Sequence, residues 1–447
     1  MAQRDSFGSG FGVLVAMAGS AVGLGNLWRF PYLVGTNGGA AFIIIYLAFI
    51  FLLALPIMYS EFIVGRRSQA NVFGAYKALA PGTKWCSVGL VYVLASLFII
   101  SFYCVVGGWT MDYLWKAVTF KFNTSDTAVL DGMFAQTVTS SSEPLVFMLI
   151  FLAATALIVM AGIKDGIERY TKVMMPLLFV LVVVVAIRSV TLPGGSAGLE
   201  FMFKPDFSKV TGTTLLNALG QAFFSLSIGC GTIMTYGSYV NKKENIVGLS
   251  AQTAITDTLF AIIAGLAIMP AVFAFGISPA EGPGLVFVTL PYIFAQLPFG
   301  AFLAILFFFM LFIAAITSSI SQLEVIVSYL KEEFRISRKL AIALSLAVIV
   351  VFGTLCSLSQ GTLADVKIFG QNFFDFFDKT SSNILLPLGG FFAVVFVGWK
   401  MKRPDVDDEI TSGGIHKFKP FFLNFIYYSI KYVAPVVVAT ILISGLI

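Results

Sequence analysis

The sequence contains few charged residues and a single histidine. Of its 447 residues only 11% are charged, whereas 58% are hydrophobic. Its mean hydropathy of +0.93 lies far outside the range of soluble globular domains. This composition leaves almost nothing for a soluble domain and predicts an all-α polytopic membrane protein.

The residues that commonly carry enzyme chemistry are also scarce. The single histidine, His416, falls in a predicted loop, and the sequence contains no His-Glu-x-x-His pair and no cofactor loop after a strand. The four cysteines, Cys86, Cys104, Cys230 and Cys356, lie in or at the edges of apolar runs, so we expect no disulfide framework. We therefore expect a protein that is not an enzyme.

Long apolar runs are abundant. Counting runs of about 20 residues, the length that crosses a bilayer as a helix, gives roughly eleven transmembrane helices. They lie near residues 11–34, 40–65, 87–117, 145–162, 169–190, 214–239, 247–275, 299–329, 339–358, 372–399 and 421–445.

Lysine and arginine are distributed unequally between the two sets of connecting segments. With a cytoplasmic N-terminus, the inside segments hold nineteen basic residues and the outside segments seven. Because cytoplasmic loops carry the excess of basic residues, the N-terminus is predicted inside and the C-terminus outside, in a cell (inner or plasma) membrane. The net charge of +5 follows from this topology, so we expect no nucleic-acid partner.

The first apolar run is interrupted by glycine and polar residues. It contains Gly19, Gly23 and Gly25, followed by Asn26 and Arg29. Lipid cannot replace the backbone hydrogen bonds that such a segment loses, so non-helical backbone survives at this depth only where it lines an enclosed cavity.

The sixth apolar run repeats this pattern, with Ser225, Ser227, Gly229 and Gly231 in its middle. Either segment alone is explained as well by glycines that allow close helix packing. Two such segments at matching positions of the two halves instead indicate an inverted repeat with its binding site at the membrane midplane. The broken ends offer amides to a carboxylate and carbonyls to a small cation.

Two further runs carry polar groups. In the eighth run, Ala314, Ser318 and Gln322 share one helical face with Thr317 beside them. The seventh run contains Asp257. Inserting a carboxylate at the centre of a membrane helix costs on the order of 2.5–3.5 kcal/mol, so Asp257 needs a partner, and a bound cation would be suitable. The other ionisable residues predicted within spans and treated as functional candidates are Arg29, Glu61 and Asp378.

Together these segments resemble the neurotransmitter:sodium symporter family, in particular its bacterial amino-acid transporters. The resemblance covers nearly the whole chain and is carried by Gly23–Pro31 with Asn37–Phe42, Ser225–Gly231 with Tyr236–Tyr239, and Thr317–Ser319. It implies one transporter domain, 1–447, with a five-plus-five inverted repeat and unwound helices 1 and 6. The first repeat would be 1–190 (helices 1–5), the second 214–399 (helices 6–10), and 421–445 an additional helix 11.

The resemblance implies two sodium (Na+) sites. The first would consist of the Ala21 carbonyl, the Asn26 side chain, Ser225, a residue of the seventh span and the carboxylate of the substrate. The second would consist of the carbonyls of Gly19, Val22 and Ala314 and the hydroxyls of Thr317 and Ser318. The second set holds neutral oxygens only, which suits a monovalent ion that must also leave, since tight calcium sites usually include carboxylates.

The seventh-span ligand departs from the asparagine that is usual in the family. Either Thr256 or Asp257 stands in its place, and we favour Asp257 because its charge offsets that of sodium. Relatives that depend on chloride carry a neutral serine close by. An acid here therefore predicts transport that does not require chloride.

The resemblance also implies a substrate site between the two breaks, with Tyr103 meeting the substrate carboxylate. Its members would be Ala21, Gly25, Ile99, Tyr103, Phe224, Ser225, Ser227, Cys230, Ser318 and Gln322. In leucine-selective relatives the positions of Cys230 and Gln322 are larger or purely apolar. A cysteine leaves more volume, and a glutamine can meet a ring hydroxyl or an indole nitrogen, so we expect tyrosine or tryptophan ahead of leucine.

Gates are implied on both sides: Arg29 with Asp378 outside, and Arg4 with Glu332 inside. In the fifth span, Gly166 and Pro176 weaken the helix near its cytoplasmic end, which predicts unwinding that admits water to the second sodium site. A kink without function is the alternative.

The expected function is a sodium-coupled secondary active symporter that imports hydrophobic, above all aromatic, L-amino acids by alternating access. The expected partners are the amino acid, sodium ions and the lipid bilayer, and the resemblance allows a homodimer. The alternative is a substrate-gated or leak ion channel of the same fold.

Overall fold

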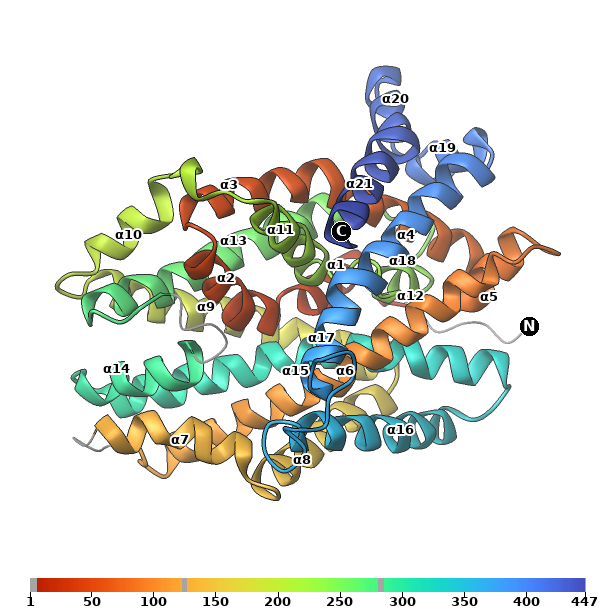
Figure 1. Ribbon diagram of the computed structural model, residues 1–447. Coiled ribbons are helices and arrows are strands. Elements are labelled where there is room, and N and C mark those ends of the chain that lie inside the picture. The colour runs from red at the N-terminus through yellow and green to blue at the C-terminus, as the bar shows by residue number, and fades with distance from the viewer. Residues whose placement is uncertain (1–5, 123–126, 280–284, 447) are drawn as a thin grey trace.

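The computed structural model describes residues 6–122, 127–279 and 285–446, and helices dominate this part of the chain. Within it, nine helices are long and apolar enough to cross a membrane, and a bent pair raises the number to ten. The sixth predicted span is split into two halves that are each too short for this test. The all-α membrane architecture is confirmed (Figure 1).

The first five spans follow the predicted runs closely. They consist of α1 (Gly10–Ala21), η1 (Gly25–Arg29) and α2 (Phe30–Thr36); α3 (Ala40–Phe49), η2 (Ile50–Ala54) and α4 (Leu55–Ser68); α6 (Cys86–Val118); α8 (Glu143–Met160); and η3 (Ile163–Glu168) with α9 (Arg169–Val190).

The remaining spans follow in the same order along the chain. They are α11 (Gly212–Ser225) with α12 (Thr232–Gly237); α13 (Ile246–Ala274); α15 (Gly300–Glu333); α16 (Arg338–Leu358); α17 (Phe373–Thr380), η6 (Ser381–Leu385), α18 (Leu386–Val395) and η7 (Phe396–Lys400); and α20 (Pro420–Tyr428), η8 (Ser429–Val433) and α21 (Ala434–Leu446).

Short helices in the connections were not predicted from the apolar runs. They are α5 (Val72–Leu79), α7 (Thr127–Thr139), α10 (Ser196–Phe203), η4 (Phe207–Lys209), η5 (Leu285–Thr289), α14 (Leu290–Gln296) and α19 (Arg403–Ile410). A search for long apolar runs passes over such helices because they are too short to cross a bilayer. Local capping marks one of them, since the Asn71 side chain accepts hydrogen bonds from the amides of Phe73 and Gly74 at the start of α5.

The fifth span begins earlier than predicted, at Ile163 rather than near residue 169. Its first turn is π-helical and follows Gly162, whose φ of +88° favours glycine. A Cβ on Gly166 would lie 2.2 Å from the Ile158 carbonyl oxygen, so the glycine allows this turn to pack against the end of α8. Pro176 lies inside α9. The predicted unwinding of this segment stays a prediction.

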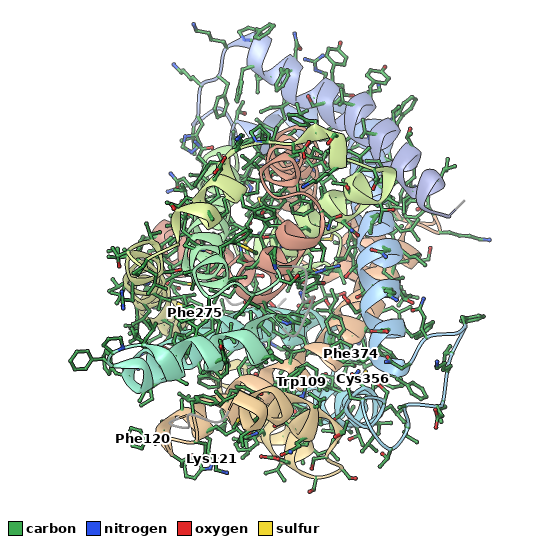
Figure 2. The ribbon with its side chains drawn as sticks, turned by 60° about the vertical axis from the view of Figure 1, so that its left-hand side comes forward. Trp109, Phe120, Lys121, Phe275, Cys356 and Phe374 are labelled. Atoms are coloured by element: carbon green, nitrogen blue, oxygen red, sulfur yellow. The ribbon has the colours of Figure 1, made fainter. Side chains whose placement is uncertain are left out.

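The long helices α6 and α15 pack against each other through the middle of the molecule (Figure 1). At the end of α6, Trp109 stacks on Phe374 of α17 with ring centroids 5.7 Å apart, and both are labelled in Figure 2. The four cysteines are free thiols, as predicted. The helices α1, α9 and α12 also pack against α15, and α1 packs against α13. The residues of both breaks, 22–24 and 226–231, are buried, so the two broken spans lie in the interior.

Candidate functional site

The break in the first span separates α1 from η1 at Val22–Leu24. The side chain of Asn26 folds back and its Oδ1 accepts a hydrogen bond from the Gly23 amide at 3.2 Å. The Leu24 amide donates to the Tyr103 hydroxyl of α6 at 3.1 Å. Side chains thus satisfy two amides that the interrupted helix leaves open.

The break in the sixth span runs from Leu226 to Gly231, between α11 and α12. Gly229 and Gly231 have φ of +80° and +82°, which glycine adopts without strain. A Cβ on Gly229 would lie 2.0 Å from the Leu386 carbonyl oxygen. Its amide donates to Oε1 of the fully buried Glu61 at 2.8 Å. Glu61, singled out in the sequence, therefore supports the broken backbone.

The carboxylate of Asp257 stands at the centre of a buried polar cluster. Asn26 Nδ2 donates to its Oδ1 at 2.8 Å, and the Ser225 hydroxyl donates to its Oδ2 at 2.7 Å. The Tyr46 hydroxyl lies 3.3 Å from the same Oδ2. All four side chains are fully buried. The partners are neutral, so they leave the negative charge of the carboxylate uncompensated. The oxygen atoms of these side chains therefore suit a small cation.

Of the two alternatives for the seventh-span residue, Asp257 is therefore the one that meets Asn26 and Ser225. Thr256 is half-buried and Asp257 fully buried. Tyr46 was missed, although a tyrosine in the middle of an apolar run carries a hydroxyl that needs a partner.

The residues of the second predicted cation site are brought together less completely. The Thr317 hydroxyl donates back to its own helix, to the carbonyls of Ile313 and Ala314 at 3.1 and 3.0 Å. The Ser318 hydroxyl donates across to the Ser20 carbonyl at 3.1 Å. Ser20 lies between Gly19 and Val22, whose carbonyls are predicted cation ligands. The Ser20 carbonyl was not among the predicted ligands. Of these two hydroxyls, that of Ser318 reaches α1, where it bonds to a carbonyl that was not predicted, and that of Thr317 bonds within α15.

A narrow cavity lies between the two breaks. All residues predicted to surround a substrate line it except Ser225, which bonds to Asp257 instead. Three further residues were not predicted: Ser20, Gly23 and Leu386. A Cβ on Gly23 would lie 2.1 Å from Ser318 Oγ and 2.9 Å from the Tyr103 hydroxyl, so any larger residue would fill the space between these polar groups.

At one end of this cavity, the side-chain amide of Gln322 is held in place by Ser96. Gln322 Oε1 lies 2.9 Å from the Ser96 hydroxyl, and its Nε2 lies 3.5 Å from the sulfur of Cys230. Ser96 also lies 2.8 Å from the Cys230 carbonyl oxygen. Gln322 is therefore tied to α6 and to the break in the sixth span. Ser96 was not predicted, because a serine within a span commonly bonds to its own helix.

The predicted outer gate residues are joined through a serine. Arg29 Nη1 donates to the Ser382 hydroxyl at 3.1 Å, and this hydroxyl lies 3.1 Å from Asp378 Oδ1. The guanidinium of Arg29 also lies over the Phe224 ring, 4.8 Å from its centroid. Ser382 was not predicted. It links the two charged side chains above the narrow cavity.

On the opposite side, Glu332 is one of the two predicted gate residues. Its Oε2 accepts hydrogen bonds from the backbone amide and the side-chain amide of Asn71 at 2.8 and 3.0 Å. Arg4, the other predicted member, lies outside the described residues.

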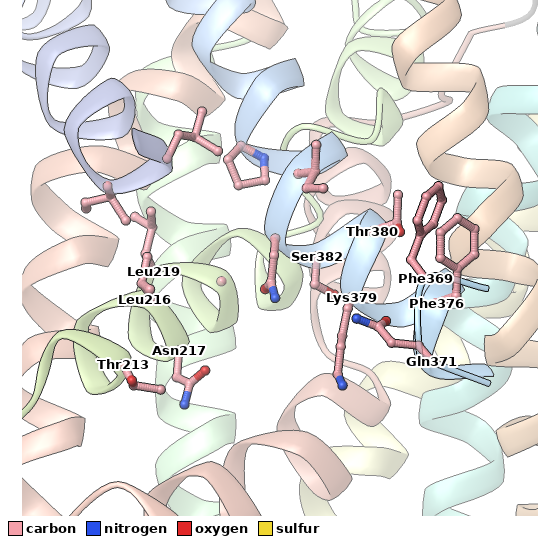
Figure 3. Close-up of a pocket in the computed structure, with 16 residues that line it drawn as sticks. Thr213, Leu216, Asn217, Leu219, Phe369, Gln371, Phe376, Lys379, Thr380 and Ser382 are labelled. Atoms are coloured by element: carbon pink, nitrogen blue, oxygen red, sulfur yellow. The ribbon is translucent and has the colours of Figure 1, made fainter. Parts of the chain in front are cut away.

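A larger cavity of about 470 Å³ lies between α11, the tenth span and α21 (Figure 3). Its lining includes Asn217, Lys379 and Ser382, with apolar side chains such as Leu216 and Phe376. It contains neither broken backbone nor the Asp257 cluster. The narrow cavity, and not this larger one, is therefore the candidate functional site.

The sequence of this chain is similar to those of known proteins. The model of the sodium:neurotransmitter symporter family matches residues 4–131 and 129–447. The uncharacterized sodium-dependent transporter YhdH of Bacillus subtilis is 39% identical, over 98% of this chain and 96% of that protein. An uncharacterized sodium-dependent transporter of Haemophilus influenzae is 37% identical, over 99% and 98%.

The fold is similar to a solved structure as well. The crystal structure of MhsT in complex with L-phenylalanine superposes with a TM-score of 0.94 at 42% identity. The match covers 99% of this chain and 100% of that chain.

Proposed function

Since this chain belongs to the sodium:neurotransmitter symporter family, we propose that it imports hydrophobic, above all aromatic, L-amino acids together with sodium. The family consists of sodium-dependent transporters, so the protein is a multi-pass membrane transporter and not an enzyme.

The observation that carries the proposal is the buried cluster of Asn26, Ser225 and Asp257 beside the broken first span. A sodium ion bound by these oxygens and by the Ala21 carbonyl would lie next to the carboxylate of a substrate in the narrow cavity. That carboxylate would complete the ion's coordination, and the amides of the broken helices would stabilise it. Ion and substrate then raise each other's affinity by the same factor.

A second sodium ion would bind between α1 and α15. Its ligands would be the carbonyls of Gly19, Val22 and Ala314 with the hydroxyls of Thr317 and Ser318. In the described structure Ser318 donates to the Ser20 carbonyl, so its hydroxyl would rotate on binding to offer an oxygen to the ion. This ion would hold the first span against α15.

Aromatic substrates are supported by the cavity's side chains. The relative MhsT was crystallised with L-phenylalanine. In this chain Cys230 and Gln322 line the cavity, and Gln322 offers an amide to a ring hydroxyl or an indole nitrogen. Tyrosine and tryptophan are therefore proposed ahead of leucine.

The charge of Asp257 supports transport that does not require chloride. Because the carboxylate lies among neutral partners, it already supplies the negative charge that an anion would bring near the first sodium ion. Arg29 and Asp378 would close the outer side, and Glu332 with Arg4 the inner side. Unwinding at Gly166 would then open the inner path to the second sodium site.

Uptake by the purified protein in sealed vesicles tests this proposal. An inward sodium gradient should accumulate labelled tyrosine or tryptophan, and replacing sodium with potassium should abolish the accumulation. Replacing chloride with gluconate should leave it unchanged. Uptake that requires chloride, or competition in which leucine displaces both aromatics, would contradict the corresponding part, and equilibration without accumulation would indicate a channel.

A further inference from the structure

Two π-helical turns, η7 at the end of the tenth span and η8 in the last span, lie against each other. Their close approach depends on Gly398, because a Cβ there would lie 2.8 Å from the Lys431 Cα. The Trp399 indole donates from Nε1 to the Lys431 carbonyl oxygen at 2.9 Å. π-Helical turns inside α-helices are frequent at functional sites, which directs attention to the side chains around this contact.

The ammonium group of Lys431 is surrounded by aromatic rings. It lies 5.3 Å from the ring centroid of Trp399 and 5.6 Å from those of Tyr427 and Tyr432. Ion pairs between described residues do not include Lys431. A lysine within a membrane span needs a partner that stabilises its charge, and cation–π contacts with the rings supply only part of that stabilisation.

The four acidic side chains of α19, in the loop between the two turns, all form ion pairs with other residues. Asp405 pairs with Arg67 at 2.5 Å, Asp408 with Lys242 at 2.5 Å, Glu409 with Arg66 at 2.8 Å, and Asp407 with Arg403 at 3.4 Å. Lys400 at the end of η7 and Lys402 directly after it are exposed. Lys400, Lys402 and Lys431 thus place positive charge at η7 and η8 that no ion pair between described residues neutralises.

Exposed aromatic side chains are found on η7 and on α20, the helix that leads into η8. Trp399 is 63% exposed, Phe421 80% and Phe425 57%. Trp399 lies in η7 of the tenth span, and Phe421 and Phe425 lie in α20 of the last span, which projects from one edge of the helix bundle (Figure 1). Aromatic rings at this position suit contact with the acyl chains and glycerol region of a lipid.

We propose that η7 and η8 form a binding site for the phosphate of an anionic phospholipid. The lipid would belong to the leaflet that faces the loop 401–419, which the charge distribution predicts to be cytoplasmic. Lys431 would donate to a phosphate oxygen, with Lys400 and Lys402 adding charge at the headgroup, and the exposed rings would contact the acyl chains. This inference does not depend on which amino acid is transported.

Lipid retention by the purified full-length protein tests the site. The protein is placed in nanodiscs of phosphatidylcholine and phosphatidylglycerol in equal parts, and native mass spectrometry counts the lipids that stay bound. The wild type should retain phosphatidylglycerol in preference to phosphatidylcholine. Lys431→Gln should weaken this preference about fivefold, the effect of one lysine near an anionic lipid, and Lys431→Arg should preserve it.

Lys339→Gln is the matched control, since Lys339 is exposed on the same predicted side at the start of α16, away from η7 and η8. Equal retention by Lys431→Gln and the wild type, or an equal loss in Lys339→Gln, would overturn the proposal. Displacement of the retained lipid by inorganic phosphate would also overturn it and assign the site to free phosphate. If Lys431→Gln fails to fold, the double variant Lys400→Gln with Lys402→Gln, which changes two exposed side chains, is measured in the same way.

Discussion

Asn26 donates a hydrogen bond to Asp257 across 2.8 Å, although 231 positions separate them in the sequence. The contact joins the broken first span to the middle of the seventh. Both side chains are fully buried, and Ser225 of the sixth span bonds to each of them. Three spans thus meet at one carboxylate, and substitutions there should test the ion chemistry directly.

Replacing the carboxylate should weaken sodium binding. Asp257→Asn removes a negative charge next to the proposed first sodium ion, and hydrogen bonds to charged groups contribute about 1.5–3 kcal/mol. We expect at least a roughly tenfold rise in the sodium concentration that gives half-maximal amino-acid binding. Scintillation proximity binding at varied sodium concentration measures this value. Thr256→Val, a change at the half-buried neighbour, should leave it unaltered; an unaltered value for Asp257→Asn would remove the carboxylate from the site.

Substrate preference should change with the amide at the end of the cavity. Gln322→Leu keeps the volume but removes the group that meets a ring hydroxyl or indole nitrogen. One hydrogen bond contributes about 0.5–1.5 kcal/mol, so the ratio of tyrosine to leucine affinity should fall roughly two- to tenfold. Competition against a labelled substrate gives this ratio. Ser96→Ala, which frees the same amide without removing it, should change the ratio less. A constant ratio in Gln322→Leu would show that the glutamine does not contact the substrate.

The proposed outer gate should loosen when the serine between Arg29 and Asp378 is replaced. Ser382→Ala breaks the hydrogen bonds between Arg29 and Asp378, so bound substrate should dissociate roughly two- to tenfold faster. Dissociation of labelled substrate after dilution measures this rate. The matched control is Ser381→Ala, because Ser381 bonds to the backbone of Asp378 and not to its carboxylate. If both variants release substrate at the same rate, the serine bridge does not hold the gate.

The loop helix α19 should contribute stability that depends on pH. Lys242 donates to Asp408 at 2.5 Å and holds the pKa of that carboxyl below its ordinary value of 3.8. The resulting stability is present above pH 3.8 and is lost as the pH falls through the lower pKa of the folded state. The side chains of Lys242 and Asp408 are 51% and 39% exposed, so solvent screens the pair and we expect it to contribute roughly 0.2–1 kcal/mol.

Thermal unfolding in detergent can detect this contribution. Asp408→Asn should unfold at a lower temperature than the wild type at neutral pH, and the difference should shrink towards about pH 3. Asp365→Asn, at an exposed acid in another loop, should match the wild type at both pH values. A difference of the same size at both pH values would mean that the carboxylate's charge is not the cause.

Several hydrogen-bond partners in the site could not be predicted from the sequence. Asp257 was expected to need a partner, yet the sequence did not reveal that Tyr46 bonds to it alongside Asn26 and Ser225. Ser96 and Ser382 resemble any other serine in an apolar run. Their roles depend on contacts with Gln322 and Arg29, which are distant in the chain.

The sequence by itself determined the membrane class, the approximate spans, the two paired breaks and the family, because apolar length and interrupting glycines are local properties of the chain. Tertiary structure decided which polar groups meet. It connected Arg29 to Asp378 through Ser382, directed the Ser318 hydroxyl to the Ser20 carbonyl, and brought η7 against η8 around Lys431. Such contacts depend on how helices cross, and a hydroxyl or an amide can satisfy its hydrogen bonds in several ways until packing selects one.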